Sequence, residues 1–233
     1  MSVLRTTTRR RVVIAALAAL LLATAGCATS TGRGNDVAEQ GARDAAGATR
    51  QQVERMSLHE EFDLAGERYE RGQALLADAQ ARISDGVWTW NGGDVLPLPG
   101  DDAFGDVPDG ATAENSYSFR TVRILHPEGA TGAAADLEPM RRWFDEEGWR
   151  SRSAEIGQST ELRADTGDGW WVTWTVRKNG QYSVGVYSET FWTNDTDALV
   201  EAIAVRDPAD FPEESAPGVS APFPKWSDPV REP

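Results

Sequence analysis

The strongest constraint on the fold is a pair of alternating segments, residues 170–177 and 181–191, separated by Lys178-Asn179-Gly180. A two-residue turn at Asn179-Gly180 would scatter the valines over both faces of the pair. A three-residue loop with Gly180 in the left-handed region instead gathers the valines on one face. Because burial sets strand register, the sequence predicts this second pairing, an antiparallel hairpin with one apolar face.

A long helix is predicted to begin after Ser57, because Ser57 and Glu60 have the spacing of a capping box. Apolar residues then recur at steps of three and four over 58–83, which gives one apolar stripe, and Gly86 ends the pattern. We interpret the stripe as a face packed on the helix's own domain. A coiled-coil dimer that uses the same stripe is the alternative.

Further elements complete an α+β prediction. Residues 87–90 alternate and suggest a short strand or edge, and a strand over 117–125 changes its apolar parity near Arg120, which indicates a bulge or two partly covered faces. A helix over 134–147 is closed by Gly148 and Trp149. The remaining elements are a weaker strand over 152–164 and a short helix over 197–205. The expected domain, residues 57–205, is α+β with a mainly antiparallel sheet of about four strands (β-α-β-β-β) and two packing helices.

Two segments lack any periodicity. Residues 91–115 are rich in Gly, Pro and Asp and read as a loop; the aspartates would suit calcium, but without EF-hand spacing solvated turn residues are the commoner explanation. Residues 206–233 contain seven prolines, so regular structure is not expected there. We expect partial docking of this Pro-rich tail through its aromatic residues, with disorder as the alternative.

The N-terminal segment has the layout of an export signal. Arg9, Arg10 and Arg11 precede an apolar run over 12–23 that is too short to span a bilayer, and Gly26-Cys27 follows. This segment resembles the lipobox of bacterial lipoproteins, which implies cleavage between Gly26 and Cys27 and a diacylglycerol on the Cys27 thiol. An ordinary secretory signal is the alternative. The arginine run also resembles a twin-arginine signal, so the export route stays open.

The net charge limits the classes of partner that the exported chain is expected to bind. Four of the 23 basic residues precede Cys27, so the 19 that remain oppose 37 acidic residues, a formal charge of −18. This balance argues against nucleic acid and against polybasic membrane contact. Membrane attachment would therefore depend on the lipid, with residues 27–56 as a polar tether. The near absence of lysine among the basic residues is typical of a GC-rich, actinobacterial source.

The polar face of the predicted hairpin offers the best candidate binding site. It carries the directly opposed aromatic pair Trp171 and Tyr187, flanked by Thr173 and Arg177. Aromatic rings on an open sheet can stack on the faces of sugars or on prolines, so these four residues predict a site for cell-wall polysaccharide or a small ligand. The alternative is that the Pro-rich tail or a helix covers the pair.

Candidate catalytic residues are few. The two histidines, His59 in the first turn of the long helix and His126 before a proline, are better explained as solvated residues than as bases. The sequence has no paired histidines, no GxSxG or SxxK motif and no phosphate-binding loop. We therefore predict no catalytic residue, no metal site and no cofactor, although the fold could still bring Ser, Asp and Glu together.

The order of these features resembles a known family. An export signal ending in cysteine, a tether, a capped helix, a Gly/Asp loop, a strand, a helix closed at Gly148-Trp149, further strands and a Pro-rich tail with Pro224-Lys225-Trp226 occur in turn. This order resembles the LppA-like lipoproteins of mycobacteria. The resemblance implies an envelope lipoprotein without an assigned biochemical role, and it supplies Cys27 alone as a functional residue.

Together these patterns predict a lipid-anchored cell-envelope lipoprotein on the extracytoplasmic face of the cell membrane. Its domain is expected to be a non-enzymatic interaction or structural module with a protein partner in the envelope. The alternative is a module that binds cell-wall glycan or a small ligand through the aromatic sheet face.

Overall fold

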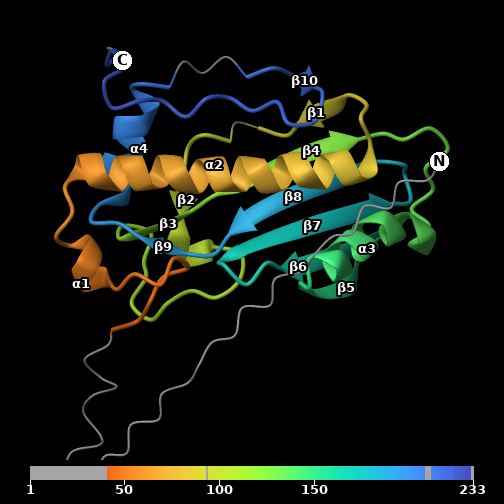
Figure 1. Ribbon diagram of the computed structural model, residues 1–233, viewed down its shortest axis with the longest axis horizontal. Coiled ribbons are helices and arrows are strands. Elements are labelled where there is room, and N and C mark those ends of the chain that lie inside the picture. Colours follow the sequence, from red (N-terminus) through yellow and green to blue (C-terminus); the bar gives the residue numbers. More distant parts are fainter. Residues whose placement is uncertain (1–40, 93, 208–210, 232–233) are drawn as a thin grey trace, which may run out of the picture. The chain divides into compact units, whose positions relative to one another are not determined.

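The centre of the fold is a seven-stranded antiparallel sheet (Figure 1). The computed structural model describes residues 41–92, 94–207 and 211–231, so the predicted signal segment, Gly26 and Cys27 lie outside the described residues. In spatial order the strands are β10 (Glu214–Ser215), β1 (Trp88–Trp90), β4 (Arg120–Leu125), β8 (Tyr182–Ser188), β7 (Trp170–Arg177), β6 (Ser159–Asp165) and β5 (Arg150–Ile156). A smaller sheet has the order β2 (Leu98–Pro99), β3 (Ser116–Ser118) and β9 (Phe191–Trp192).

Two of the four helices in the described residues precede the strands, and the other two lie between strands along the chain. The four are α1 (Arg50–Val53), α2 (Leu58–Ile83), α3 (Glu138–Glu146) and α4 (Thr196–Ala204), with two 3₁₀ turns, η1 (Gly100–Asp102) and η2 (Ala134–Leu137). The predicted α+β class with a mainly antiparallel sheet is therefore confirmed. The sheet is larger than the four strands expected. The predicted strand over 152–164 is in fact the hairpin of β5 and β6, which turns at Gly157, and the short strands β1 and β10 extend the opposite edge.

The hairpin of β7 and β8 has the predicted register. Trp171 pairs with Tyr187 and Thr175 pairs with Ser183 across the two strands, and Gly180 takes a φ of 81° in the connecting loop. The valines of both strands face the core and are buried. Burial of the apolar face was therefore a sufficient guide to the strand pairing.

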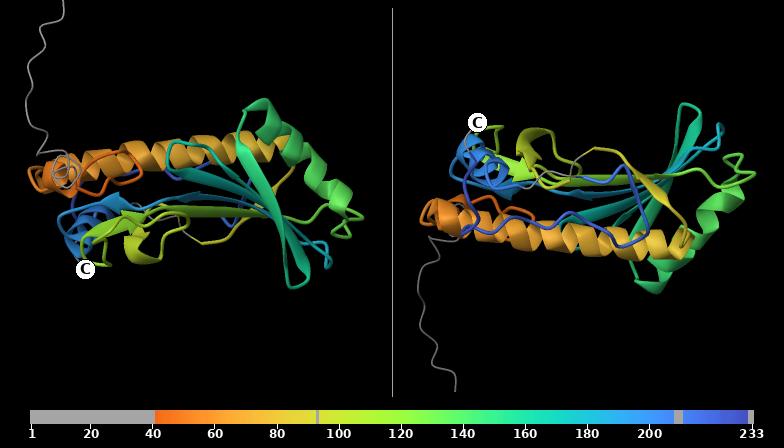
Figure 2. Two further views of the ribbon diagram at one scale, coloured as in Figure 1. Left: turned by 90° about the horizontal axis from the view of Figure 1, so that it is seen from below. Right: turned by 90° about the horizontal axis from the view of Figure 1, so that it is seen from above.

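Helix α2 covers one face of the main sheet (Figure 2). Ser57 forms the predicted capping box with Glu60, and the Glu60 backbone N–H donates to Ser57 Oγ at 3.3 Å. The buried apolar residues of α2 are Phe62, Ala65, Tyr69, Gly72, Leu75, Leu76 and Ala79. Since the apolar stripe is already buried against strands of its own domain, it is not available for the coiled-coil alternative.

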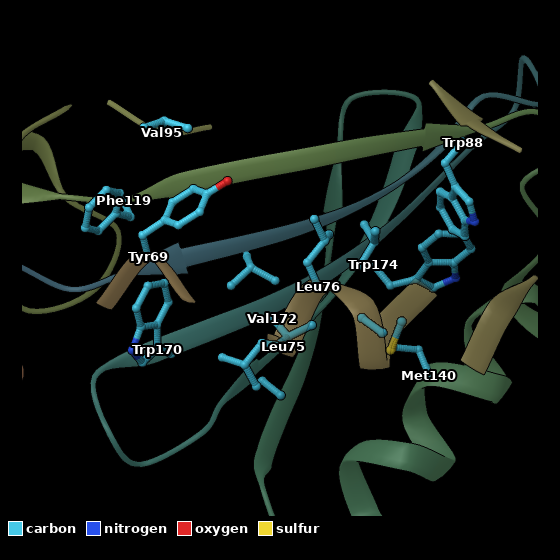
Figure 3. Packing of buried hydrophobic residues seen from close by; sticks show 14 of the residues in the cluster. Tyr69, Leu75, Leu76, Trp88, Val95, Phe119, Met140, Trp170, Val172 and Trp174 are labelled. Carbon is cyan, nitrogen blue, oxygen red and sulfur yellow. The ribbon is translucent and has the colours of Figure 1, made fainter. Parts of the chain in front are cut away.

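The core between α2 and the sheet is rich in tryptophan (Figure 3). Trp88 of β1 meets Trp174 of β7 edge to face, with ring centres 6.3 Å apart, and the Trp174 indole N–H donates to the Asp136 carbonyl oxygen at 2.9 Å. Helix α3 closes one end of this core. Its predicted cap is confirmed, because Gly148 has a φ of 72° and the Trp149 N–H donates to the Phe144 carbonyl oxygen at 2.9 Å.

The parity change predicted near Arg120 marks a switch between the two sheets. Strand β3 belongs to the small sheet and β4 to the main sheet, and Phe119 lies between them. Its backbone N–H donates to the buried Ser188 side chain at 2.7 Å, while its carbonyl oxygen accepts from the Ser188 N–H at 2.9 Å. The switch turns Arg120 outward on the face opposite α2, which matters for the site described below.

Residues 41–56, which the sequence suggested as tether, pack against the domain. The buried Asp44 carboxylate accepts from the backbone N–H groups of Ala48 at 2.9 Å and Trp192 at 3.1 Å, and the Ala45 N–H donates to the Thr190 carbonyl oxygen at 3.0 Å. Val53 of α1 is also buried. Polar composition suggested a flexible segment, but here the polar groups are satisfied by the domain itself.

The described part of the Pro-rich tail docks, although mainly on α2 rather than on the sheet. Phe223 and Trp226 pack on Phe62, with ring centres 5.3 Å away in each case. The Tyr69 hydroxyl donates to the Ala221 carbonyl oxygen at 2.6 Å. One short regular element, β10, forms where the tail pairs with β1.

One glycine of α2 permits a close contact with the core. A Cβ at position 72 would lie 2.9 Å from the ring of Trp170, which is 3% exposed. We expect Gly72→Val to lower the free energy of unfolding, measured by denaturant titration, by about 1–3 kcal/mol. Gly66→Val is the matched control: it would meet the half-buried Phe223 of the docked tail, which can shift. Equal losses at the two positions would contradict this explanation.

Candidate functional site

The face of the main sheet opposite α2 is the candidate site. No described helix covers its central strands, whereas α2 lies along the other face (Figure 2). The strand pairings place on this open face the side chains of Arg120, Val122, Ile124, Arg150, Arg152, Ala154, Ile156, Ser159, Glu161, Arg163, Asp165, Trp171, Thr173, Thr175, Arg177, Ser183 and Tyr187. Its charge is unusual for so acidic a chain, since arginines outnumber carboxylates.

A groove of about 350 Å³ crosses the centre of this face. Its lining residues are Asn91, Arg120, Val122, Ile124, Ile156, Ser159, Glu161, Thr175, Arg177, Gln181, Ser183 and Tyr187, and we call it the open-face groove. An adjoining hollow of about 270 Å³ shares Asn91, Arg120 and Val122 and adds the exposed Leu96 and Leu98. The groove thus combines amide and hydroxyl groups with an apolar floor and guanidinium groups.

The Gly/Asp loop over 91–115 contributes Phe104 to the same face. Its ring stacks on Tyr187, with centres 4.7 Å apart, and meets Trp171 edge to face at 5.6 Å. The Arg163 guanidinium lies 4.6 Å from the Phe104 ring centre. Gly105 follows with a φ of 103°, and a Cβ there would lie 2.6 Å from the Trp171 indole nitrogen, so glycine permits this approach.

Phe104 therefore divides the predicted aromatic platform. Tyr187 lines the open-face groove, whereas Trp171 lines a separate hollow of about 180 Å³ with Arg150 and Arg152. The sequence alternatives were cover by the tail or by a helix; the structure shows partial cover by this loop. Both rings remain half-buried rather than fully exposed.

The other predicted binding residues have different surroundings. Arg177 lines the groove, and its Nη1 donates to Ser183 Oγ at 3.1 Å. Thr173 is only 2% exposed, beneath the ring of Tyr187 that lies over Gly185. Thr173 is therefore not accessible to a ligand.

Sequence reasoning missed Arg120, Asn91 and Phe104 as members of the site. The parity change near Arg120 was a usable signal for Arg120, because it implied that this residue turns away from the core. Asn91 and Phe104 belong to the loop, whose path has no periodic signal.

A carboxylate at the edge of the open face has a perturbed environment. Burial raises the pKa of Glu189, and a hydrogen bond from the Trp171 indole N–H, 2.9 Å long, opposes this rise. The negative charges of Asp106 and Asp165 raise the pKa further. Glu189 contacts Trp171 rather than the groove, so we assign it a role in holding the loop and not in chemistry.

Neither histidine lies in the open-face groove. His59 stacks on Trp226 of the docked tail, with ring centres 4.7 Å apart, and His126 is exposed after β4. In the part of the chain that the structure describes, no three His, Cys, Asp or Glu side chains are grouped as they would be to hold a metal ion. One loop aspartate, Asp94, is buried in an ion pair with Arg123 instead of being solvated.

Among the described residues, no helix is both long enough and apolar enough to cross a bilayer.

Comparisons with known proteins give little further information. No family model and no curated protein matches the chain. Among solved structures, the chain is similar to LppA, a proposed lipoprotein from Mycobacterium tuberculosis, at 18% identity and a TM-score of 0.36, over 74% of this chain and 95% of that one. This likeness is too distant to carry an argument about fold or function, so the proposals below rest on the residues of this chain.

Proposed function

We propose that this chain is a lipid-anchored lipoprotein of the cell envelope whose domain acts as a binding or interaction module. The position of Cys27 is the observation that supports lipid anchoring. The chain's only cysteine directly follows a basic and apolar segment that has the layout of an export signal. The open-face groove supports binding as the role of the domain, since it brings amide and guanidinium groups together above an apolar floor.

The anchor is tested by the mass of the native product. In a bacterial host that processes lipoproteins, we expect the chain to begin at Cys27, to carry fatty-acyl mass and to fractionate with membranes. The variant Cys27→Ser is expected to lose the acyl mass, and its membrane-bound fraction should fall at least tenfold, because diacylation is what makes attachment durable.

The control variant Ala28→Ser makes a similar small change one residue later and should keep both the acyl mass and the membrane fraction. A parent product that begins elsewhere, or that carries no fatty-acyl mass, would contradict the anchor. Neither result would depend on what the groove binds.

The class of partner is tested by crosslinking in cells. A photoreactive residue at Ile156, at the end of the open-face groove and 51% exposed, should capture what binds there. The same residue at Val219, 45% exposed on the tail and outside the groove lining, is the control. A reproducible protein adduct at Ile156 alone supports an interaction module, and glycan adducts there support a glycan-binding module. Equal labelling at both positions would contradict a role for the groove.

A further inference from the structure

Two arginines of the open-face groove have no carboxylate partner. Arg120 is exposed, with its guanidinium carbon 5.7 Å from the ring centre of Tyr187. The Arg177 guanidinium is held within its own hairpin by Ser183 Oγ and, at 3.5 Å, by the Gln181 carbonyl oxygen. Among the described residues neither arginine forms an ion pair. A guanidinium has five N–H donors, so most donors of both arginines remain available.

The one carboxylate that lines the groove is already compensated. Glu161 accepts from Arg163 Nε at 2.8 Å and from Thr175 Oγ1 at 3.4 Å. Its negative charge is therefore matched by Arg163, and it does not neutralise Arg120 or Arg177. The groove consequently has a local positive charge.

This positive charge stands out against an exported chain with a formal charge of −18. Charges separated by more than about 8–10 Å are largely screened at physiological ionic strength. A ligand with one or a few anionic groups therefore responds mainly to the arginines beside it, while a long polyanion meets repulsion from the rest of the surface. The charge pattern therefore favours a ligand that has one or a few anionic groups over a long polyanion.

The remaining lining residues indicate the body of such a ligand. Asn91 and Gln181 offer amide groups and the half-buried Ser159 offers a hydroxyl, while Val122 and Ile124 form an apolar floor. This mixture matches the alternating hydroxyl edges and apolar C–H faces of a sugar. The volume of about 350 Å³ suits one sugar unit, and the adjoining hollow of about 270 Å³ gives room for a second.

We propose that the open-face groove binds an anionic sugar unit, a monosaccharide that bears a carboxylate or a phosphate, with Arg120 at one end of the groove or Arg177 at the other binding the anionic group. The forked N–H donors of a single guanidinium suit either oxyanion. The half-buried Tyr187, which stacks on Phe104, also lines the groove. This inference rests on the proposed binding role of the domain, and it is independent of the lipid on Cys27.

The test is calorimetric titration of the full exported protein in a neutral detergent with three probes: glucuronate, glucose 6-phosphate and glucose. We expect at least one anionic probe to bind at least tenfold more tightly than glucose, and whichever binds more tightly identifies the oxyanion. The double variant Arg120→Gln/Arg177→Gln should weaken that binding at least tenfold. Rising salt should weaken it in the parent.

The matched control is Arg82→Gln/Arg141→Gln, which makes the same charge change on α2 and α3 at side chains that are 46% and 38% exposed. It should bind within twofold of the parent. Thermal unfolding should show that both double variants remain folded. Equal affinity for glucose and both anionic probes, or equal binding by the groove variant and the parent, would overturn the proposal.

A lipid headgroup is the competing source of an anion. Vesicles of phosphatidylglycerol in phosphatidylcholine, added to protein without the acyl group, separate the two. Binding to these vesicles that needs Arg120 and Arg177, with no binding of either anionic sugar, would also overturn the proposal. Loss of the acyl group alone would remove the anchor and leave sugar binding unchanged, so the two proposals can fail separately.

Discussion

Replacing Asp94 by alanine is expected to lower the free energy of unfolding by about 3–5 kcal/mol. Asp94 and Arg123 form an ion pair in which the two side chains are 1% and 0% exposed, with Arg123 Nη1 3.1 Å from Asp94 Oδ1. The Arg123 guanidinium carbon also lies 3.6 Å from the ring centre of Trp90. Removing the carboxylate leaves a buried cation without its counterion. The cost of keeping this guanidinium out of water is then no longer offset, which lowers the free energy of unfolding.

Denaturant titration measures this effect, and a surface ion pair provides the comparison. Glu146→Ala breaks the contact with Arg82 between side chains that are 54% and 46% exposed, so its cost should stay below about 1 kcal/mol. The double change Asp94→Leu/Arg123→Met should recover much of the lost stability, because it removes both charges and not one. A loss at Asp94→Ala as small as that at Glu146→Ala would show that water reaches the pair.

Glu61→Ala is expected to lower the free energy of unfolding by about 3 kcal/mol. The Glu61 carboxylate is 4% exposed and accepts from Thr193 Oγ1, from the Asn194 N–H at 2.9 Å and from Asn194 Nδ2 at 2.6 Å. Asn194 Nδ2 also donates to the Val53 and Met56 carbonyl oxygens, at 3.1 and 3.2 Å. One carboxylate thus joins α2, the residues around α1 and the loop before α4.

The adjacent Glu60 is a natural control. It makes capping contacts with Ser57 at the exposed end of α2, which hold its pKa below the usual range. Glu60→Ala should therefore cost clearly less stability than Glu61→Ala. Amide hydrogen exchange adds a local readout: the Asn194 N–H should exchange faster in Glu61→Ala and at the parent rate in Glu60→Ala. Unchanged protection of Asn194 in Glu61→Ala would contradict the proposed role.

Periodicity was informative wherever one face of an element is buried. It predicted α2 with its capping box and the register of β7 and β8, because a shift in either would expose a row of apolar side chains. The cap at Gly148-Trp149 was also readable, since it depends on neighbours in sequence. These features fix the α+β class and most of the main sheet.

Periodicity failed where pairing depends on distant residues. The hairpin of β5 and β6 looked like one weak strand, because β5 is polar and exposed along most of its length and has no apolar pattern to mark its turn. Strand β10 extends the sheet by only two residues and was not predicted, whereas the short strand expected over 87–90 is present as β1. The hydrogen-bond and ion-pair partners of Asp44, Glu61 and Asp94 were equally unreadable, since an acidic side chain in a polar segment gives no sign that it will be buried.

The strand residues of the candidate site could be predicted from periodicity, but its loop residues could not. The aromatic pair Trp171 and Tyr187 followed from strand register alone. Its division by Phe104 did not, because the path of a loop rich in Gly and Asp depends on contacts that it makes only after folding. Arg120 entered the site through the switch between sheets at Phe119.

The docking of residues 41–56 sets the reach of the molecule. Asp44 ties the chain to β9, so 14 residues, 27–40, connect Cys27 to the first residue described. At about 3.3–3.6 Å per residue, such a connector spans at most about 50 Å. If Cys27 carries the lipid, the first residue of the folded domain stays within about 50 Å of that lipid, which limits how far the open-face groove can act from the membrane.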